Sequence, residues 1–98
     1  MPHVRLSVRA QSDISRLHAF LLKKDSNAAK RAVLAIREAF MPLEQSHMVG
    51  RPVENYDTLR ELVIDFGATG YLALYRFEQS PDVVTILAIK HQREDGYK

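Results

Sequence analysis

Five side chains in the last 40 residues could together carry out RNA chemistry: Arg60, Arg76, His91, Arg93 and Tyr97. Cleavage of an RNA backbone needs a base that activates the 2′-hydroxyl and an acid that protonates the leaving oxygen. It also needs cations that balance the extra phosphate charge in the transition state. Histidine and tyrosine can exchange protons, and arginines supply positive charge. An endonuclease is therefore one function that these residue types allow.

Each of these residues also has an ordinary structural explanation. Arg76 can pair with Glu61 across two neighbouring strands, and His91 can cap or pack at the end of a strand. Residues 93–95 have the composition of a solvated tail, and Tyr97 is one residue from the end of the chain. The residue types alone leave both RNA chemistry and protein docking open.

Other kinds of catalytic site find no support in the sequence. The glycines are isolated, so there is no phosphate-binding loop, and no serine lies in a nucleophile-elbow pattern. The four histidines have no partner at a spacing of four residues, and cysteine is absent. We expect no metal, no cofactor and no disulfide.

Length and composition fit one globular domain covering residues 1–98, with 46% hydrophobic and 27% charged residues. The apolar runs are far shorter than the roughly 20 residues that span a bilayer. The amino-terminal residues lack the apolar core of a signal peptide. We expect a cytoplasmic protein without membrane contact. The net charge is only +2, but basic residues dominate the first 40 positions. Such a surface suits nucleic acid, an acidic protein or plain solvent.

Hydrophobic periodicity predicts an α+β domain in the order β-α-α-β-β-β. Residues 3–8 alternate as a half-buried strand, and Ser7 is suited to cap a first helix over about residues 9–24. A polar cluster at 23–27 begins a second helix, which ends or bends at Pro42. Residues 44–58 show little periodicity and are predicted to be a loop. The two helices form a hairpin that packs on a small, mostly antiparallel sheet.

The rest of the chain predicts a three-stranded meander with strands at 60–66, 71–77 and 84–93 and four-residue loops at 67–70 and 79–82. This register places Glu61 opposite Arg76 and Arg76 opposite Thr85. One sheet face is apolar and is predicted to receive the helices; it carries Leu62, Ile64, Phe66, Tyr71, Ala73, Tyr75, Phe77, Val84, Ile86 and Ala88. The other face has an apolar centre and a charged rim, and its members include Leu72, Leu74, Leu87, Ile89 and His91. A face of this kind indicates a partner surface or the floor of a site.

Several motifs, in this order, resemble the RelE/ParE superfamily of bacterial type II toxins. They are Ser7-x-x-Ala10-x-x-Asp13-Ile14-x-x-Leu17-x-x-Phe20-Leu21, Asn27-Ala28-Ala29, Gly50-Arg51-Pro52, Arg60-x-Leu62, Tyr71-x-x-x-Tyr75-Arg76 and Val84-x-Ile86-Leu87-Ala88-Ile89-x-His91-x-Arg93. The resemblance covers nearly the whole chain and agrees with the predicted order of elements.

The resemblance implies one of two activities. RelE-like members are ribosome-dependent mRNA endonucleases with clustered lysines and arginines and a carboxyl-terminal tyrosine, whereas ParE-like members inhibit DNA gyrase. This chain has Leu62 and Leu72 where a RelE-like site would have cations, and Arg93 and Tyr97 match the RelE-like ending only loosely. The ParE-like branch is favoured, with no catalytic residues. The alternatives are a RelE-like endonuclease acting on ribosome-bound mRNA, or a non-toxic member that acts only as a binding partner.

The resemblance also implies a partner, a ParD-like antitoxin encoded in the same operon and bound in a hetero-oligomer. We expect its apolar segment to cover a groove between helices and sheet, and its acidic residues to suit the basic helical half. The residues predicted to bind it are Ile14, Leu17, Leu21, Leu72, Leu74, Leu87 and Ile89.

Overall fold

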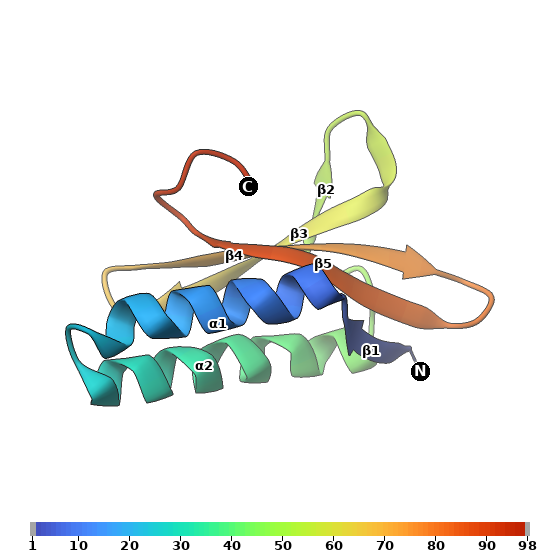
Figure 1. Ribbon diagram of the computed structural model, residues 1–98. Coiled ribbons are helices and arrows are strands. Elements are labelled where there is room, and N and C mark those ends of the chain that lie inside the picture. The colour runs from blue at the N-terminus through green and yellow to red at the C-terminus, as the bar shows by residue number, and fades with distance from the viewer. Residues whose placement is uncertain (1, 98) are drawn as a thin grey trace.

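The computed structural model describes residues 2–97 and places two helices on one face of a five-stranded sheet (Figure 1). The elements in chain order are β1 (His3–Leu6), α1 (Val8–Leu22), α2 (Ser26–Phe40), a 3₁₀ turn η1 (Met41–Glu44), β2 (Arg51–Val53), β3 (Tyr56–Phe66), β4 (Thr69–Glu78) and β5 (Val83–His91). The strand order is β1-β5-β4-β3-β2. Among the strands of residues 2–97, the β1–β5 pair is parallel and the other three pairs are antiparallel. The predicted α+β class and the helical hairpin on a mostly antiparallel sheet are confirmed.

Both helices begin at polar caps that the sequence predicts. The Ala10 N–H donates to the Ser7 hydroxyl at the start of α1. The carboxylate of Asp25 accepts from two backbone N–H groups at the start of α2. These caps satisfy donors that the first turn of a helix cannot pair internally. Helix α2 ends just before Pro42, as predicted. Within residues 2–97, neither helix is long and apolar enough to cross a membrane.

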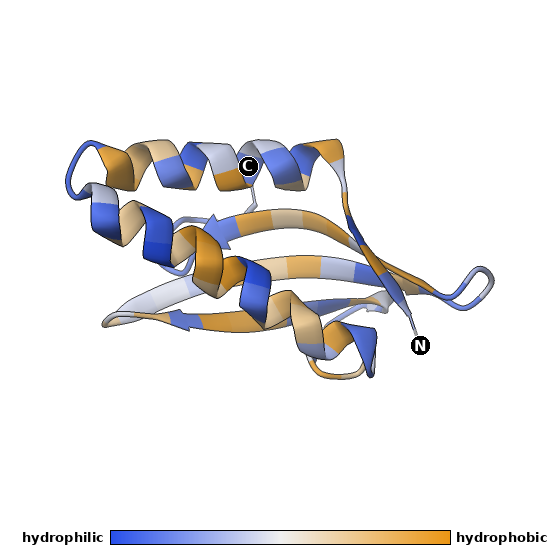
Figure 2. Cartoon of the chain, turned by 90° about the horizontal axis from the view of Figure 1, so that it is seen from below, coloured by the Kyte–Doolittle hydropathy of each residue, from blue (hydrophilic) through white to orange (hydrophobic). Residues whose placement is uncertain are grey.

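The hydrophobic core lies between the two helices and the sheet, where orange segments of the strands lie behind the helices (Figure 2). Its largest fully buried side chains are Tyr75, Ile36, Leu43, Ile86, Ile89 and Val84. Each such side chain contributes about 1.5–3 kcal/mol through removal of apolar surface from water. The core thus fixes the helical hairpin on one face and leaves the other sheet face, here called the outer face, without a helical layer (Figure 1).

The free half of strand β5 is covered by polar side chains of α1 and of its N-cap residue. The Ser7 hydroxyl donates to the Leu87 carbonyl at 3.0 Å. The Ile89 N–H donates to the Asp13 carboxylate at 2.9 Å, and Arg16 reaches the Ile89 carbonyl at 3.5 Å. An unpaired strand edge would otherwise be open to another chain. Helix α1 therefore closes this edge as well as part of the core.

The β3–β4 hairpin corrects the predicted register by two residues. Phe66 pairs with Thr69, so the loop is two residues long and not four. Gly67 begins this turn with φ +62°, a conformation that two-residue hairpins require. As a result Glu61 lies opposite Leu74, and the predicted Glu61–Arg76 pairing is wrong. A shift of two residues preserves the faces, which is why the predicted core face on these strands is still correct.

A bulge in the β4–β5 pair corrects the assignment of the last strand. Tyr75 pairs with Ile86 while Leu74 pairs with Ala88, so Leu87 is the extra residue. Beyond a bulge the alternation of side chains is reversed. Ile89 therefore joins the core, and Ala88 faces the outer side. Two further differences are the short strand β2, which lies inside the predicted 44–58 loop, and the end of β5 at residue 91.

Candidate functional site

The five residues that could carry RNA chemistry are not brought together. Arg60 and His91 lie on the helix-covered face, but Arg60 is opposite Tyr75 and His91 is opposite Tyr71. Four residues along a strand correspond to about 13 Å. Arg76 lies on the outer face, near the end of β4. Strand position separates Arg60 from His91, and Arg76 lies on the opposite face from both.

Arg60 holds the loop before β2 in place. Its guanidinium donates to the Gly50 carbonyl at 2.6 Å and to the Met48 carbonyl at 3.4 Å. The Tyr75 hydroxyl completes this arrangement, because it accepts from Gly50 N–H and donates to the His47 carbonyl, each at 2.7 Å. Burial raises the pKa of Tyr75 above its ordinary value, although the Gly50 N–H and Arg60 act in the opposite direction. Through these hydrogen bonds, Arg60 and Tyr75 stabilise the loop before β2.

Glu61 is the centre of a small polar cluster on the outer face. Arg51 donates to its carboxylate through two nitrogens, at 2.5 and 3.1 Å, and the Tyr97 hydroxyl donates at 2.7 Å. Arg76 instead pairs with Glu78 at 3.3 Å. Desolvation acts to raise the pKa of Glu61, but the hydrogen bonds from Tyr97 and Arg51 and the Arg51 charge outweigh it and hold the pKa below its ordinary value of 4.5.

Tyr97 is held on the outer face by the same cluster. The chain turns after β5 and carries its carboxyl-terminal residues to the side of the sheet away from the helices (Figure 1). The Lys90 ammonium lies 5.5 Å from the Tyr97 ring centroid, and it also donates to the Glu94 carbonyl at 2.8 Å. Desolvation, followed by the hydrogen bond to Glu61, raises the pKa of Tyr97. A phenol held neutral and bonded to a carboxylate is poorly suited to act as a base.

His91 and Arg93 occupy a third location, where the end of β5 meets α1. The His91 Nε2 lies 3.0 Å from the Thr69 hydroxyl, and the Arg93 N–H donates to Nδ1 at 3.1 Å. The His91 ring also meets the Tyr71 ring edge-on, with centroids 5.6 Å apart. Both nitrogens of this imidazole thus have partners within the fold. The two residues help to line a cavity of about 650 Å³ beside α1, called here the tail cavity.

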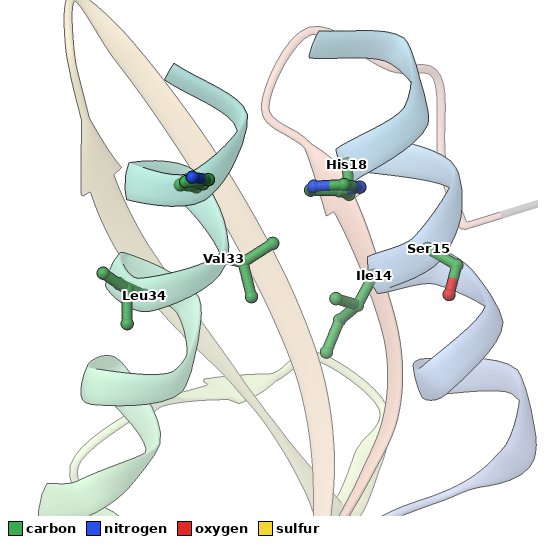
Figure 3. A pocket seen from close by; sticks show the side chains of 6 residues that line it. Ile14, Ser15, His18, Val33 and Leu34 are labelled. Atoms are coloured by element: carbon green, nitrogen blue, oxygen red, sulfur yellow. The ribbon is translucent and has the colours of Figure 1, made fainter. Parts of the chain in front are cut away.

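A second hollow, the helical groove, runs between α1 and α2 and has a volume of about 530 Å³ (Figure 3). Its lining is Ile14, Ser15, His18, Lys30, Val33 and Leu34. Ile14 and Val33 point into the space between the helices, and Leu34 is 57% exposed. An apolar groove between two amphipathic helices can receive the apolar face of another peptide. This groove is the best candidate for a protein-binding surface.

The seven residues predicted to bind an antitoxin are spread over several places. Leu17 and Ile89 are 7% and 1% exposed and belong to the core, so their side chains stabilise the fold and offer little surface. Ile14 lines the helical groove, and Leu21 lines the tail cavity. The half-buried members of the set on β4 and β5 are Leu72, Leu74 and Leu87. For all seven residues antitoxin binding stays a prediction.

The sequence interpretation missed the contribution of α2 to the groove. Val33 belongs to the apolar stripe of this helix, and Leu34, which is 57% exposed, lies one position beside that stripe. A residue one position beside a buried stripe lies at its border and can reach the surface.

Within residues 2–97, the structure contains no group of three or more histidine, aspartate or glutamate side chains placed to hold a metal ion. In the same range, no buried side-chain nitrogen or oxygen is left without a hydrogen-bond partner. Each buried polar side-chain atom in this range therefore has a hydrogen-bond partner inside the fold.

A family model and a curated relative both match nearly the whole chain. Residues 4–96 match the family model described as the ParE toxin of the type II toxin-antitoxin system, parDE. The chain is 37% identical over 94 residues to Toxin RelE3 of Caulobacter vibrioides, covering 96% of this chain and 98% of that protein.

Two solved structures have the same fold over nearly all of this chain. One comes from the chromosomal ParDE system of P. aeruginosa, with a TM-score of 0.79, 23% identity and coverage of 93% of this chain and 96% of that chain. The other comes from the RelBE2 toxin-antitoxin complex of Mycobacterium tuberculosis, with a TM-score of 0.67, 25% identity and coverage of 94% and 100%.

Proposed function

Because this chain belongs to the ParE toxin family of type II toxin-antitoxin systems, within the RelE/ParE superfamily, we propose that it inhibits DNA gyrase by protein docking. In this proposal a cognate, ParD-like antitoxin from the same operon binds the chain directly and neutralises it in a hetero-oligomer. Both proteins act in the cytoplasm. No step of the proposal requires a bond to be made or broken by this chain.

The separation of Arg60, Arg76 and Tyr97 from the neighbouring pair His91 and Arg93 carries the proposal. A metal-free ribonuclease site needs its base, acid and cations within hydrogen-bonding reach of one scissile phosphate. Here Arg60 binds carbonyls of the loop before β2, Arg76 pairs with Glu78, and Tyr97 donates to Glu61. These three groups satisfy partners inside the fold. The arrangement supports docking over cleavage.

The helical groove supports a peptide partner. Its apolar lining has Lys30 at its margin, and Arg31 is exposed on the same helix. An amphipathic antitoxin segment with acidic residues beside its apolar face would match both features. The two solved neighbours come from toxin-antitoxin systems, which supports a cognate antitoxin as the partner.

Substitution of the groove tests the antitoxin part of the proposal. Leu34→Glu places a charge in the apolar lining, and we expect the affinity for the product of the neighbouring reading frame to fall by about tenfold or more. Leu22→Glu is the matched control, because Leu22 is 50% exposed on α1 and lines neither the helical groove nor the tail cavity. Calorimetric titration measures the affinity of each variant for this partner. Equal affinities of the two variants would count against docking in the groove.

Gyrase inhibition is tested with purified enzyme and plasmid DNA. We expect the chain to trap a gyrase complex with cleaved DNA, seen as linear DNA after denaturation and protease treatment. Addition of the neighbouring gene product before gyrase should prevent this. An unchanged plasmid at every concentration of the chain would contradict the gyrase assignment.

A ribosome-dependent mRNA endonuclease is the second candidate, and the name of the relative Toxin RelE3 favours it. In that case His91 and Arg93, which lie together at the tail cavity, are the residues whose loss should matter. Transcript cleavage in a translating extract that disappears with His91→Ala or Arg93→Ala would select this candidate. Normal growth on expression without antitoxin would instead indicate a non-toxic binding protein.

A further inference from the structure

The tail cavity combines an apolar floor with positive charge at its margin. It lies where the carboxyl-terminal part of α1, the β3–β4 turn and the residues after β5 meet. Its apolar lining, here called the floor, includes the buried Leu17 and Tyr71 and the half-buried Leu21 and Phe66. Its volume of about 650 Å³ is within the range of cavities that bind small ligands or peptide side chains. The floor can therefore accept an apolar group.

Three cations and one carboxylate surround this floor. Arg16, Phe20 and Lys24 follow one another at intervals of four residues, so they form one stripe along α1. Arg93 faces them from the residues after β5. The carboxylate of Glu94 is bonded to Arg16 at 3.1 Å and to the His91 N–H at 2.9 Å. Its negative charge is thus already placed beside Arg16.

Lys24 and Arg93 are the cations that stay available. Within residues 2–97, neither has a carboxylate within ion-pairing distance. Lys24 lies 4.5 Å from the ring centroid of Phe20, a contact that leaves its ammonium at the surface. Two unneutralised cations on either side of an apolar floor favour a ligand that carries negative charge beside an apolar group.

The aromatic rings favour a peptide over a nucleotide base. Base stacking needs an open ring face. Lys24 lies over one face of the Phe20 ring, and Tyr71 is 3% exposed with the His91 ring edge-on to it. An aliphatic side chain needs only a gap between side chains, which the cavity provides. The chemistry therefore fits an acidic peptide segment with an aliphatic residue at its centre.

We propose that the tail cavity anchors an acidic, aliphatic segment of the antitoxin, with an aliphatic side chain between Phe20 and Phe66 and carboxylates on Lys24 and Arg93. This proposal rests on the proposed function, since it assumes that the chain has an antitoxin. It adds a second contact beyond the helical groove. Both contacts use α1, because Ile14 and His18 line the groove while Leu17 and Leu21 line the cavity.

Charge reversal at the cavity tests the proposal with the full-length chain and the full-length product of the neighbouring reading frame. We expect Lys24→Glu and Arg93→Glu each to raise the Kd by about tenfold, measured by calorimetry. Lys23→Glu is the matched control, because Lys23 is also exposed at the end of α1 but does not line the cavity. We expect it to change the Kd by less than about twofold. Equal effects of Lys23→Glu and Lys24→Glu would overturn the proposal, because long-range charge alone would explain them.

A second arm separates this proposal from the proposed function. The ¹⁵N-labelled chain is titrated with an acetylated, amidated hexapeptide of sequence DELLED, with its lysine counterpart KKLLKK and with a twelve-nucleotide RNA. We expect only DELLED to shift the amide resonances of Phe20, Thr69 and Arg93. If the product of the neighbouring reading frame does not bind the chain, the proposed function is wrong. The peptide titration then still tests whether the tail cavity binds an acidic, aliphatic peptide. Shifts by RNA, or by no probe, would overturn the acidic-peptide assignment.

Discussion

Asp13 is the polar residue whose loss should damage the fold most. Its side chain is 10% exposed, and its carboxylate accepts from the Ile89 N–H at 2.9 Å, at the free half of β5. Ile89 itself is 1% exposed. Asp13→Ala leaves this buried N–H without an acceptor, which costs about 1–3 kcal/mol, and hydrogen bonds to charged groups lie near the upper end of that range.

The ion pairs of Asp13 add little to this figure. Arg9 lies at 3.5 Å and Arg16 at 3.8 Å, but both arginines are more than 40% exposed, so each pair contributes less than about 1 kcal/mol. Alanine also favours the helix by roughly 0.5 kcal/mol over aspartate, which offsets part of the loss. The expected net cost of Asp13→Ala is about 2–3 kcal/mol. For a domain of this size, that corresponds to a fall in Tm of about 10–20 °C.

Urea denaturation and amide exchange together check this reasoning. Asp13→Asn retains an oxygen acceptor and loses only the charge, so we expect it to cost about 1 kcal/mol. Ser12→Ala, at the exposed neighbouring position, is the control for substitution in this helix and should have little effect. The Ile89 amide should exchange much faster with solvent in Asp13→Ala. A free energy of unfolding equal to that of Ser12→Ala, with slow exchange retained at Ile89, would refute the role given to Asp13.

Two further predictions concern the hairpin and the outer face. A Cβ at position 70 would overlap the Ile64 carbonyl oxygen, so Gly70→Ala should cost at least about 3 kcal/mol. Gly67→Ala meets open space and should cost only about 1–2 kcal/mol for its positive φ; equal urea midpoints would contradict this contrast. Because the folded pKa of Glu61 is lowered, the extra stability of the wild type over Glu61→Gln should be present above about pH 4.5 and disappear as the pH falls through the folded pKa. Urea titrations at pH 7 and pH 3 measure this, and a pH-independent difference would contradict it.

The sequence was sufficient for features that depend on local chemistry. Ser7 and the 23–27 cluster predict the starts of both helices, because short polar side chains there can accept from free N–H groups. The 79–82 loop and the Arg76–Thr85 pairing are confirmed for the same reason, since Pro81 and Asp82 are strong turn residues.

Features that depend on close approach between strands could not be predicted in this way. Gly70 was assigned to a turn, whereas it lies within β4 because only a residue without a Cβ fits beside Ile64. The bulge at Leu87 has no marker in the sequence, and it moved Ile89 to the other face. Strand β2 is three residues long and contains Pro52, so no period of two could reveal it.

In the candidate site, too, the sequence was sufficient for residue types and insufficient for long-range contacts. Residue types were enough to single out the basic and aromatic residues of the last 40 positions. The hydrogen-bond partners of these residues depend instead on the strand register and on where the chain runs after β5. Glu61 was assigned to Arg76, and its partners are Arg51 and Tyr97. Tyr97 reaches Glu61 across 36 positions of sequence, which no local pattern encodes.

The central claim is that this chain acts by docking and not by cutting RNA. The most direct measurement is a pair of reactions with one preparation of the full chain over the same concentrations: supercoiling of relaxed plasmid by gyrase, and integrity of a defined mRNA in a translating extract. We expect supercoiling to be lost while the transcript stays intact. Transcript cleavage at concentrations that leave supercoiling unaffected would contradict the account.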